Sequence, residues 1–484
     1  MKKYKYKSIN DLREVQVFNN FLKLTEIPRP SFKEKKVSNY LKNWAEKLNL
    51  NVKQDDKFNL LILKDGQNGG ENKEALILQA HLDMVCQKKD GFDFDFDNDP
   101  IPVQIDGDEL NTGGKTTLGA DNGIGVAVIM SILEDKEMSH PPITAIFTTV
   151  EEDDFSGVNN LSKDWIIGNR AINIDNSKDD EIIAGSNGGA GVTFSLKINR
   201  QNRKFKNIFK IKVSGFLGGH SGEDIEKGRG NAIITLSRLL EKLEHSIEIL
   251  DINGGTFRLA IPRECYAIIS TDLDKNEIDN ILGDFEKELH YEYNSFSDTI
   301  CVKSEESNSE QEAIKSEDFN KIINIIKLYP NGIFEVDPKN HVVISSNNLG
   351  EIKIEYDCVK FINEIRAMER SQVEYTYNKI STIAGIYDGN VEIYAEYPGW
   401  RFNPNSKLRN IYKEIFEKEL NKKLEIKVSP AGLEAGYLIN KNPSLDIISV
   451  GPNHTGLHSP SESANIPSVI NFYETFKVFL REID

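Results

Sequence analysis

Apolar residues recur along the start of the chain with the spacing of helices that cover a sheet. Val15, Phe18 and Leu22 keep one helical face apolar, and residues 37–48 repeat the pattern. Short apolar runs of strand length follow at residues 60–63, 75–78, 143–150, 171–174 and 445–450. A helix-length apolar segment, residues 124–133, separates the second run from the third. Strands that alternate with helices predict an α/β fold in which helices flank a mixed β-sheet.

The pattern changes at about residue 191. Amphipathic strands and polar helices alternate from there on, with strands predicted at residues 205–213 and 265–271 and helices at residues 231–243, 276–289 and 319–326. A buried-strand run returns only near residue 445, after the turn Tyr397-Pro398-Gly399-Trp400. We therefore expect a candidate catalytic domain in two parts, residues 1–190 and 396–484, with an α+β domain inserted at residues 191–395.

Composition and charge narrow the class of protein. Lys and Arg total 59 against 76 Asp and Glu, a formal net charge of −17, and this acidic balance opposes binding to nucleic acid. No stretch reaches the ~18 consecutive apolar residues of a membrane span. The four cysteines lie far apart without a C-x-x-C pair, which argues against a thiolate zinc site and a disulfide framework. Because no signal-peptide apolar run follows the first residues, we expect a cytoplasmic protein without nucleic acid or membrane partners.

Polar groups that bind metals or move protons follow four of the five apolar runs. In chain order they are His81 and Asp83, Glu151 and Glu152, Asp175, and His454 and His458. The carboxyl ends of strands in open α/β sheets converge on one site. We therefore expect these side chains to meet, although they are far apart in the sequence.

Each of these groups also has an ordinary structural explanation. Asp121, which opens the apolar helix, could be an N-cap, and Glu151 and Glu152 could form a solvated acidic turn. Spacing does not choose between His454 and His458. Taken together, however, histidine and carboxylate groups at strand ends form a nitrogen and oxygen donor set that suits zinc or a similar divalent ion. Two ions bridged by one carboxylate would use five ligands and hold a hydrolytic water.

A series of short motifs occurs in an order that is similar to a known family. The motifs are HLDMV at residues 81–85, TLGADNGIG at 117–125, the adjacent glutamates at 151–152, NID at 173–175, GHSG at 219–222, AGLE at 431–434 and HSP at 458–460. Over nearly its whole length the chain resembles the aminoacyl-histidine (Xaa-His, peptidase D or bacterial carnosinase type) dipeptidases of the co-catalytic zinc aminoacylase and dipeptidase family. The resemblance implies a zinc-peptidase-like α/β fold with an inserted lid, and hydrolysis of short peptides.

The resemblance implies a site with five ligands and two divalent metal ions. His81 and Asp175 would hold one ion, and Glu152 and His458 would hold the other. Asp121 would bridge them. Zinc is the expected metal, and manganese and cobalt suit similar ligands.

The resemblance also implies roles for residues around the metals. Asp83 would orient the first histidine ligand, and Glu151 would take a proton from a metal-bridging water and return it to the leaving amine. His220, in the lid, would reach the scissile carbonyl oxygen. Arg366 is the candidate for binding the substrate carboxylate. Glu434, by its charge and position, could neutralise the substrate α-amine.

Three departures from the family pattern concern the substrate pocket. Leu259 stands where relatives carry Asn before Ala-Ile-Pro, Asp153 and Asp154 replace Ala-Gly, and Pro430 replaces His before AGLE. They leave the metal and base residues intact and bear on the histidine specificity. An N-acyl amino acid deacylase and a non-catalytic metal-containing peptide-binding relative are the alternatives, and Glu151 argues against the second because a binder needs no base. Relatives commonly form homodimers through the lid, so a dimer is a candidate here.

Overall fold

A computed structural model describes the chain except residues 1–5, 7, 294–298 and 339–340. The chain divides into two compact units. The first comprises Met1–Ser186, Trp400–Ser429 and Leu433–Asp484, and the second comprises Asn187–Gly399 with Pro430–Gly432. Residues 191–395, the predicted insertion, are part of the second unit, and so are three residues from the later segment. Among the described residues, no helix combines the length and apolar character of a membrane span.

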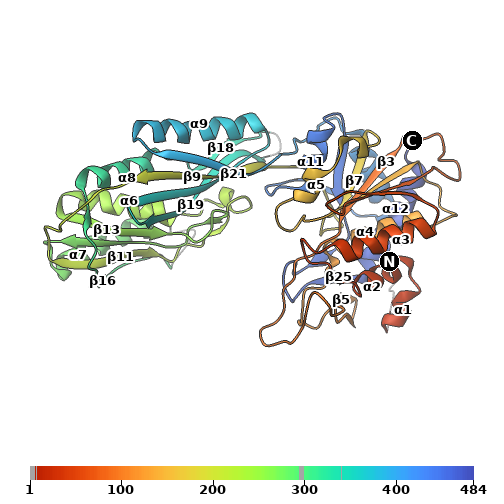
Figure 1. Ribbon diagram of the computed structural model, residues 1–484, viewed down its shortest axis with the longest axis horizontal. Coiled ribbons are helices and arrows are strands. Elements are labelled where there is room, and N and C mark those ends of the chain that lie inside the picture. Colours follow the sequence, from red (N-terminus) through yellow and green to blue (C-terminus); the bar gives the residue numbers. More distant parts are fainter. Residues whose placement is uncertain (1–5, 7, 294–298, 339–340) are drawn as a thin grey trace. The chain divides into compact units, whose positions relative to one another are not determined.

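A mixed sheet forms the centre of the first unit (Figure 1). Its strands lie in the order β1 (Asn51–Gln54), β2 (Leu60–Lys64), β6 (Ile143–Thr148), β3 (Leu76–His81), β7 (Arg170–Ile174), β23 (Asp446–Val450), β8 (Glu181–Ser186) and β22 (Glu425–Ser429). Neighbours from β6 to β23 run parallel, whereas β2 pairs antiparallel with β1 and β6, and β8 pairs antiparallel with β23. Each predicted apolar run overlaps one of these strands, so the prediction of a mixed α/β sheet is confirmed.

Helices flank this sheet. They are α1 (Ile9–Arg13), α2 (Gln16–Leu24), α3 (Lys35–Lys47), α4 (Ala120–Glu134), α5 (Ser156–Asn160), α10 (Lys407–Leu420), α11 (Glu434–Lys441) and α12 (Ile466–Glu482), with a 3-10 turn at Lys163–Trp165. One core joins α2, α3, α4, α10 and α12 to Leu76, Leu78 and Ala80 of β3. Because side chains alternate along a strand, Gln79 and His81 point to the other face, where Gln79 contacts α11.

A small antiparallel sheet completes the first unit. Its strands lie in the order β24 (His454–Thr455), β25 (Ser463–Asn465), β5 (Glu109–Asn111) and β4 (Gln104–Asp106). Pairing of β25 with β5 brings the loop between β24 and β25 beside the chain that leads into α4.

The second unit is built on an antiparallel sheet. Its strands lie in the order β16 (Cys301–Glu306), β11 (Asn207–Ser214), β15 (Cys265–Thr271), β13 (Ile247–Gly254), β19 (Val343–Glu355), β20 (Cys358–Ala367), β9 (Gly188–Lys197) and β21 (Asn390–Tyr397), and β18 (Gly332–Val336) pairs with β19. Two short pairs, β10 (Arg200–Gln201) with β17 (Ala313–Ile314) and β12 (Gly219–His220) with β14 (Ala260–Ile261), lie outside it.

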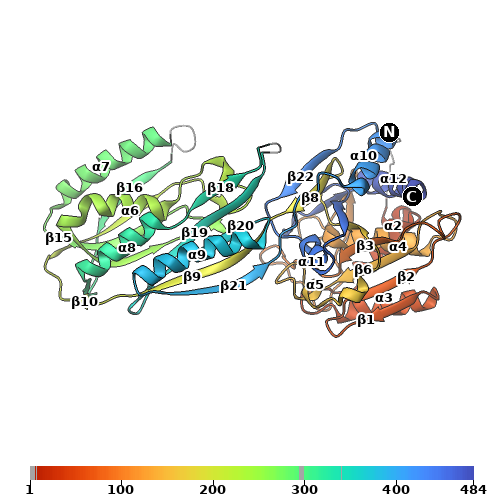
Figure 2. The same cartoon turned by 90° about the horizontal axis from the view of Figure 1, so that it is seen from above.

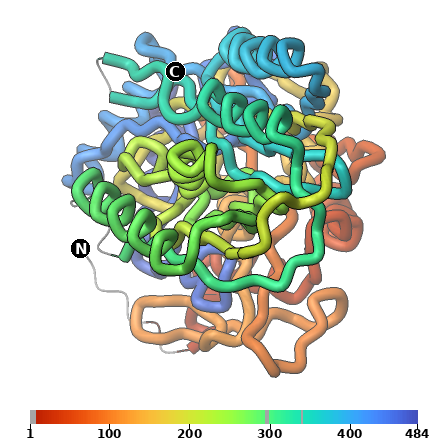
Figure 3. Tube along the Cα trace, turned by 90° about the vertical axis from the view of Figure 1, so that its left-hand side faces the viewer, coloured from red at the N-terminus to blue at the C-terminus, as the bar shows by residue number. Residues whose placement is uncertain are grey.

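Four helices pack on one face of this second sheet (Figure 2; green to blue coils in Figure 3). They are α6 (Ala232–Leu243), α7 (Lys275–Glu292), α8 (Ser316–Leu328) and α9 (Arg370–Ile386), with 3-10 turns at Ile225–Lys227 and Glu244–Ser246. Alternate residues of the strands, such as Phe209, Ile211 and Val213 of β11, form one core with these helices. The unit therefore has a core separate from that of the first unit.

Candidate metal centre

Three neighbouring parallel strands of the first unit end at the same edge of its sheet. β3 ends at His81, and β7 is followed directly by Asp175. β6, on the other side of β3, leads into the turn that contains Glu151 and Glu152. The parallel pairing brings these four side chains together, as the strand-end rule predicts.

Asp121 and His458 reach the same place from outside these strands. Asp121 is the second residue of α4, where its backbone is not helical (φ −83°, ψ 108°). The N-cap of α4 is Gly119, so the alternative interpretation of Asp121 as an N-cap is wrong. His458 lies in the loop between β24 and β25.

One carboxylate lies between the two imidazoles. Asp121 Oδ1 is 3.0 Å from His81 Nε2, and Asp121 Oδ2 is 3.5 Å from His458 Nε2. His81 Nε2 is also 3.4 Å from Asp175 Oδ1, and His458 Nε2 is 2.9 Å from Glu152 Oε2. His81 with Asp121 and Asp175, and Asp121 with Glu152 and His458, therefore form two donor groups that share Asp121. A third group joins His81 to Glu151 and Glu152, and His454 belongs to none of the three.

The carboxylates of these groups and His458 line a cavity of about 300 Å³. Its lining residues are Asp121, Glu151, Glu152, Asp153, Phe155, Asp175, Leu433 and His458. The His458 side chain is 53% exposed, so one side of the donor set is open to solvent. A small molecule can approach the acidic groups from that side.

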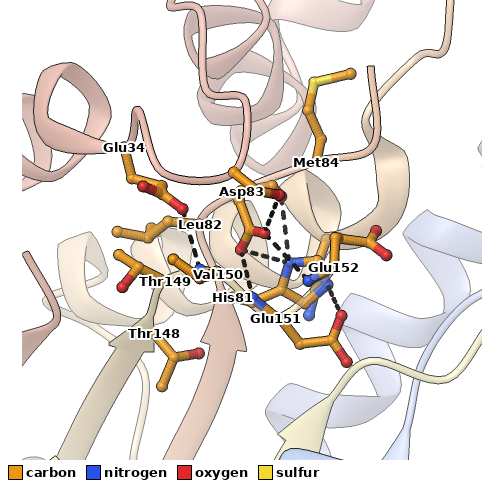
Figure 4. Close-up of polar contacts among 12 residues, drawn as sticks. Glu34, His81, Leu82, Asp83, Met84, Thr148, Thr149, Val150, Glu151 and Glu152 are labelled. Atoms are coloured by element: carbon orange, nitrogen blue, oxygen red, sulfur yellow. Dashed lines mark hydrogen bonds and ion pairs between the residues drawn. The ribbon is translucent and has the colours of Figure 1, made fainter. Parts of the chain in front are cut away.

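Asp83 fixes both the first histidine and the glutamate turn (Figure 4). Its carboxylate lies 3.5 Å from His81 Nδ1 and accepts hydrogen bonds from the backbone N–H groups of Glu151 (3.1 Å) and Glu152 (3.2 Å) and from Ser31 Oγ (2.8 Å). Burial alone would raise the pKa of Asp83, but these contacts outweigh burial and hold the pKa below its usual value. An ionised Asp83 keeps Nδ1 of His81 protonated and leaves Nε2 free to bind a metal.

Glu434 lies on the same side of the sheet at the start of α11. Its side chain is fully buried, and Oε2 accepts hydrogen bonds from Thr148 Oγ1 (2.8 Å) and Gln79 Nε2. Oε1 is buried without a hydrogen-bond partner. Burial raises the pKa of Glu434 to about 8. Its predicted contact with a substrate amine stays a prediction.

His220 and Arg366 lie together in the second unit. Arg366, on β20, donates hydrogen bonds to Tyr397 Oη (3.1 Å) and the Pro430 carbonyl oxygen (3.0 Å). Its Nη2 is 3.2 Å from His220 Nε2, and its Nε contacts Ser221 Oγ at 3.3 Å. Burial, together with the Arg366 charge, lowers the pKa of His220, so the imidazole is neutral at neutral pH.

Comparisons with known proteins show the family of this chain. The model of Peptidase family M20/M25/M40 matches residues 77–482. The chain belongs to this peptidase family. The family resemblance of the sequence motifs is thereby confirmed, and membership of the family makes the protein a hydrolase.

Full-length relatives of this M20/M25/M40 peptidase include dipeptidases. The chain is 32% identical over 481 residues to the cytosol non-specific dipeptidase of Escherichia coli K12, covering 98% of this chain and 99% of the relative. It is 30% identical to the aminoacylhistidine dipeptidase of Vibrio alginolyticus, with a TM-score of 0.91 and coverage of 100% of this chain and 99% of that one. The aminopeptidase PepT of Bacillus cereus, at 15% identity and a TM-score of 0.57 over 97% of this chain and 98% of that one, shares the fold.

The donor set of this M20/M25/M40 peptidase fits divalent cations. Burial, together with neighbouring carboxylates, raises the pKa of Glu151, Glu152 and Asp175. Oε1 of Glu152 is buried without a hydrogen-bond partner. Crowded carboxylates beside two imidazoles need positive charge, which a divalent metal supplies. The chemistry of the donors therefore matches a metal centre.

Two buried residues of the peptidase were missed by the sequence predictions. Glu462 accepts hydrogen bonds from the chain that leads into Asp121. Arg29 donates to the same segment and to Leu82, which follows β3. Neither residue follows an apolar run, so a search for polar groups at the ends of predicted strands could not find them. The only sequence signal was the place of Glu462 four residues after His458.

Proposed function

We propose that this chain is a metal-dependent dipeptidase that works with two divalent ions, of which zinc is the expected metal. The shared position of Asp121 between His81 and His458 carries the proposal, since one carboxylate belongs to two donor groups. His81 and Asp175 would hold one ion, Glu152 and His458 the other, and Asp121 would bridge them. Bound metals would supply Lewis-acid polarisation of the scissile carbonyl and a lowered pKa for the attacking water.

Glu151 is the proposed general base. Its carboxylate lines the cavity and lies 3.8 Å from His81 Nε2, farther than the carboxylates of Asp121 and Asp175. Its backbone is held by Asp83, so the carboxylate keeps its place while the proton moves. Glu151 would accept a proton from the attacking water and pass it to the leaving amine.

Substrate binding is assigned to three further residues. Arg366 would bind the substrate carboxylate, for which a guanidinium fork is suited. His220 would reach the scissile carbonyl oxygen. Glu434 would bind the substrate α-ammonium group. Two observations support this role: Glu434 directly follows Leu433, which lines the cavity, and Oε1 of Glu434 has no hydrogen-bond partner.

We further propose aminoacyl-histidine dipeptides as the substrate class. The full-length similarity to the Vibrio alginolyticus aminoacylhistidine dipeptidase supports this choice. The name of the Escherichia coli relative supports a cytosolic location.

A homodimer formed through the second unit is also proposed. Light scattering tests it, because a mass near 54.7 kDa would mean a monomer.

The test is an assay of the zinc-loaded protein, with metal content measured on the same sample. Free dipeptides with and without a C-terminal histidine are compared with N-acetyl amino acids. We expect hydrolysis of dipeptides that stops on chelation and returns with zinc, and a higher kcat/KM for the histidine series. Preference for N-acetyl amino acids would identify a deacylase. Two bound metals without hydrolysis of any small peptide would identify a peptide-binding relative.

A further inference from the structure

Glu462 is a buried carboxylate beneath the segment that carries Asp121. Its side chain is only 3% exposed. Oε2 accepts hydrogen bonds from the backbone N–H groups of Leu118 (2.7 Å) and Gly119 (2.9 Å), and Oε1 accepts from those of Ala120 (2.8 Å) and Asp121 (3.2 Å). One carboxylate therefore binds four consecutive peptide groups of segment 118–121.

The shape of segment 118–121 depends on this anion. Four successive N–H groups that point at one spot repel one another unless a negative charge accepts them. Gly119 adopts a left-handed conformation (φ 69°), and a Cβ atom there would overlap the Arg29 guanidinium and the Met84 sulfur. Hydrogen bonds to a charged acceptor are stronger than those to a neutral one. A neutral side chain at position 462 could not hold the segment equally well.

Arg29 holds the same segment from its carbonyl side. The guanidinium is 2% exposed and donates to the carbonyl oxygens of Leu82 (3.0 Å) and Asp83 (2.9 Å), which follow β3. It also donates to the carbonyl oxygen of Gly119. Segment 118–121 is thus tied to the end of the strand that carries His81. The positive charge of Arg29 also offsets the buried negative charge of Glu462.

Glu462 is also connected to the loop that carries His458. The backbone N–H of Glu462 donates to the Ser459 carbonyl (3.0 Å), and Ser459 Oγ donates to the Gly456 carbonyl (2.7 Å), so the loop around His458 is internally bonded. β25 begins at the next residue, Ser463. Glu462 therefore joins the Asp121 segment to the His458 loop through one side chain.

We infer that Glu462 is a positioning residue that sets the separation of Asp121 and His458 for the metal ion they share with Glu152. The inference rests on the proposed function, because it assigns Glu462 a task only if those residues bind metal. Outer residues that orient metal ligands commonly change metal affinity by about 10–100-fold when replaced. A residue with only a structural role would change folding stability and leave the affinity of the folded protein unchanged.

Glu462→Gln tests this inference with little change in shape. The amide oxygen of Gln can accept from two N–H groups of segment 118–121, but its NH₂ group then faces the other two donors. We expect titration of the folded, metal-free variant with zinc to show at least a ~10-fold weaker second site than the wild-type protein. In the assay we expect kcat to fall while KM for the dipeptide changes little.

Glu109→Gln is the matched control. Glu109 is a partly buried carboxylate that accepts hydrogen bonds from Ser463 Oγ (3.1 Å) and Asn465 Nδ2 (2.7 Å). Both donors belong to β25, which begins directly after Glu462. Neither bond involves segment 118–121, so the zinc affinities of the variant should match those of the wild-type protein. Equal zinc affinity in Glu462→Gln and wild-type protein would overturn the inference. Failure of the wild-type protein to bind zinc would instead overturn the proposed function.

Hydrogen exchange of the wild-type, metal-free protein provides a second test that needs no variant. If the carboxylate of Glu462 holds the segment before metal binds, the amides of Leu118 to Asp121 exchange as slowly as those of β3. Exchange of these amides at the rate of an irregular loop, such as residues 308–310, would contradict the inference even if the Gln variant failed to fold.

Discussion

At the scale of single residues, buried carboxylates in the first unit differ in pKa because their hydrogen-bond partners differ. Asp83 is fully buried, yet its contacts with His81, Ser31 and two backbone N–H groups keep its pKa below the usual value. Glu34 is also buried, but burial outweighs its hydrogen bonds from Val150 and Phe32 and raises its pKa to about 7. Burial alone therefore does not decide the charge of a carboxylate.

Replacing Glu151 isolates the proton-transfer role. Glu151→Gln keeps the size of the side chain but removes the base, so we expect kcat for a dipeptide to fall by about 10²–10⁴-fold while zinc content is unchanged. Steady-state kinetics and metal analysis measure both quantities. Asp164→Asn, at an exposed acidic residue outside the cavity lining, should keep the wild-type rate. A Gln variant with near wild-type kcat would exclude Glu151 as the base.

Glu34 makes the stability of the fold depend on pH. The pKa of Glu34 is about 7 in the folded chain against an ordinary 4.5, so the folded state holds a proton that the unfolded state has lost. Stability should therefore fall as pH rises from about 4.5 through 7. Glu34→Gln should flatten this slope and gain on the order of 1–2 kcal/mol at pH 8, with no gain at pH 4. Urea unfolding across pH measures this slope. Glu46→Gln, at an exposed position of α3, the helix that begins after Glu34, should keep it.

At the scale of elements, α4 must approach the sheet closely to place Asp121. The helix packs against β3 and β7, and its first turns contain Gly123 and Gly125. A Cβ atom on Gly125 would overlap the Asn122 side chain and the carbonyl oxygen of Ile174, the residue before Asp175. Backbone of a central strand cannot move away as a side chain can, so glycine is required there by close approach.

Gly125→Ala should therefore destabilise the protein and disturb the metal centre. We expect a loss of about 1–3 kcal/mol from overpacking and weaker zinc binding, because β7 must shift just before Asp175. Gly283→Ala in α7 is the control, since a Cβ atom there meets nothing within 4 Å. That variant should gain about 0.5–1 kcal/mol from helix propensity. Chemical unfolding measures both, and equal effects of the two substitutions would refute the packing explanation.

At the scale of the whole molecule, the proposed metal ligands all belong to the first unit. Removal of metal should therefore destabilise the first unit and leave the second unchanged. A ligand present at 100 times its dissociation constant stabilises the folded state by about 2.7 kcal/mol. Hydrogen exchange with and without chelator measures the two units separately. Equal loss of protection in both would show that the units do not respond independently to metal.

Local patterns predicted much of the fold and of the candidate site. Buried strands are short apolar runs, so β2, β3, β6, β7 and β23 could be found without tertiary information. Ligand types at strand ends, together with the family motifs, then led to His81, Glu152 and Asp175. The choice of His458 over His454 needed the motif, because both lie in one loop without a periodic pattern.

Local sequence specifies which elements form and which polar groups follow them, because strand length, apolar runs and turn residues are local properties. Which distant groups meet depends on the three-dimensional fold. Glu462 and Asp121 are separated by 341 positions, and no periodicity relates them. Likewise Pro430–Gly432 belong with the second unit although they follow strands of the first. Such contacts depend on the order in which strands pair and on how loops pack, which the energy of the whole fold sets rather than any single segment.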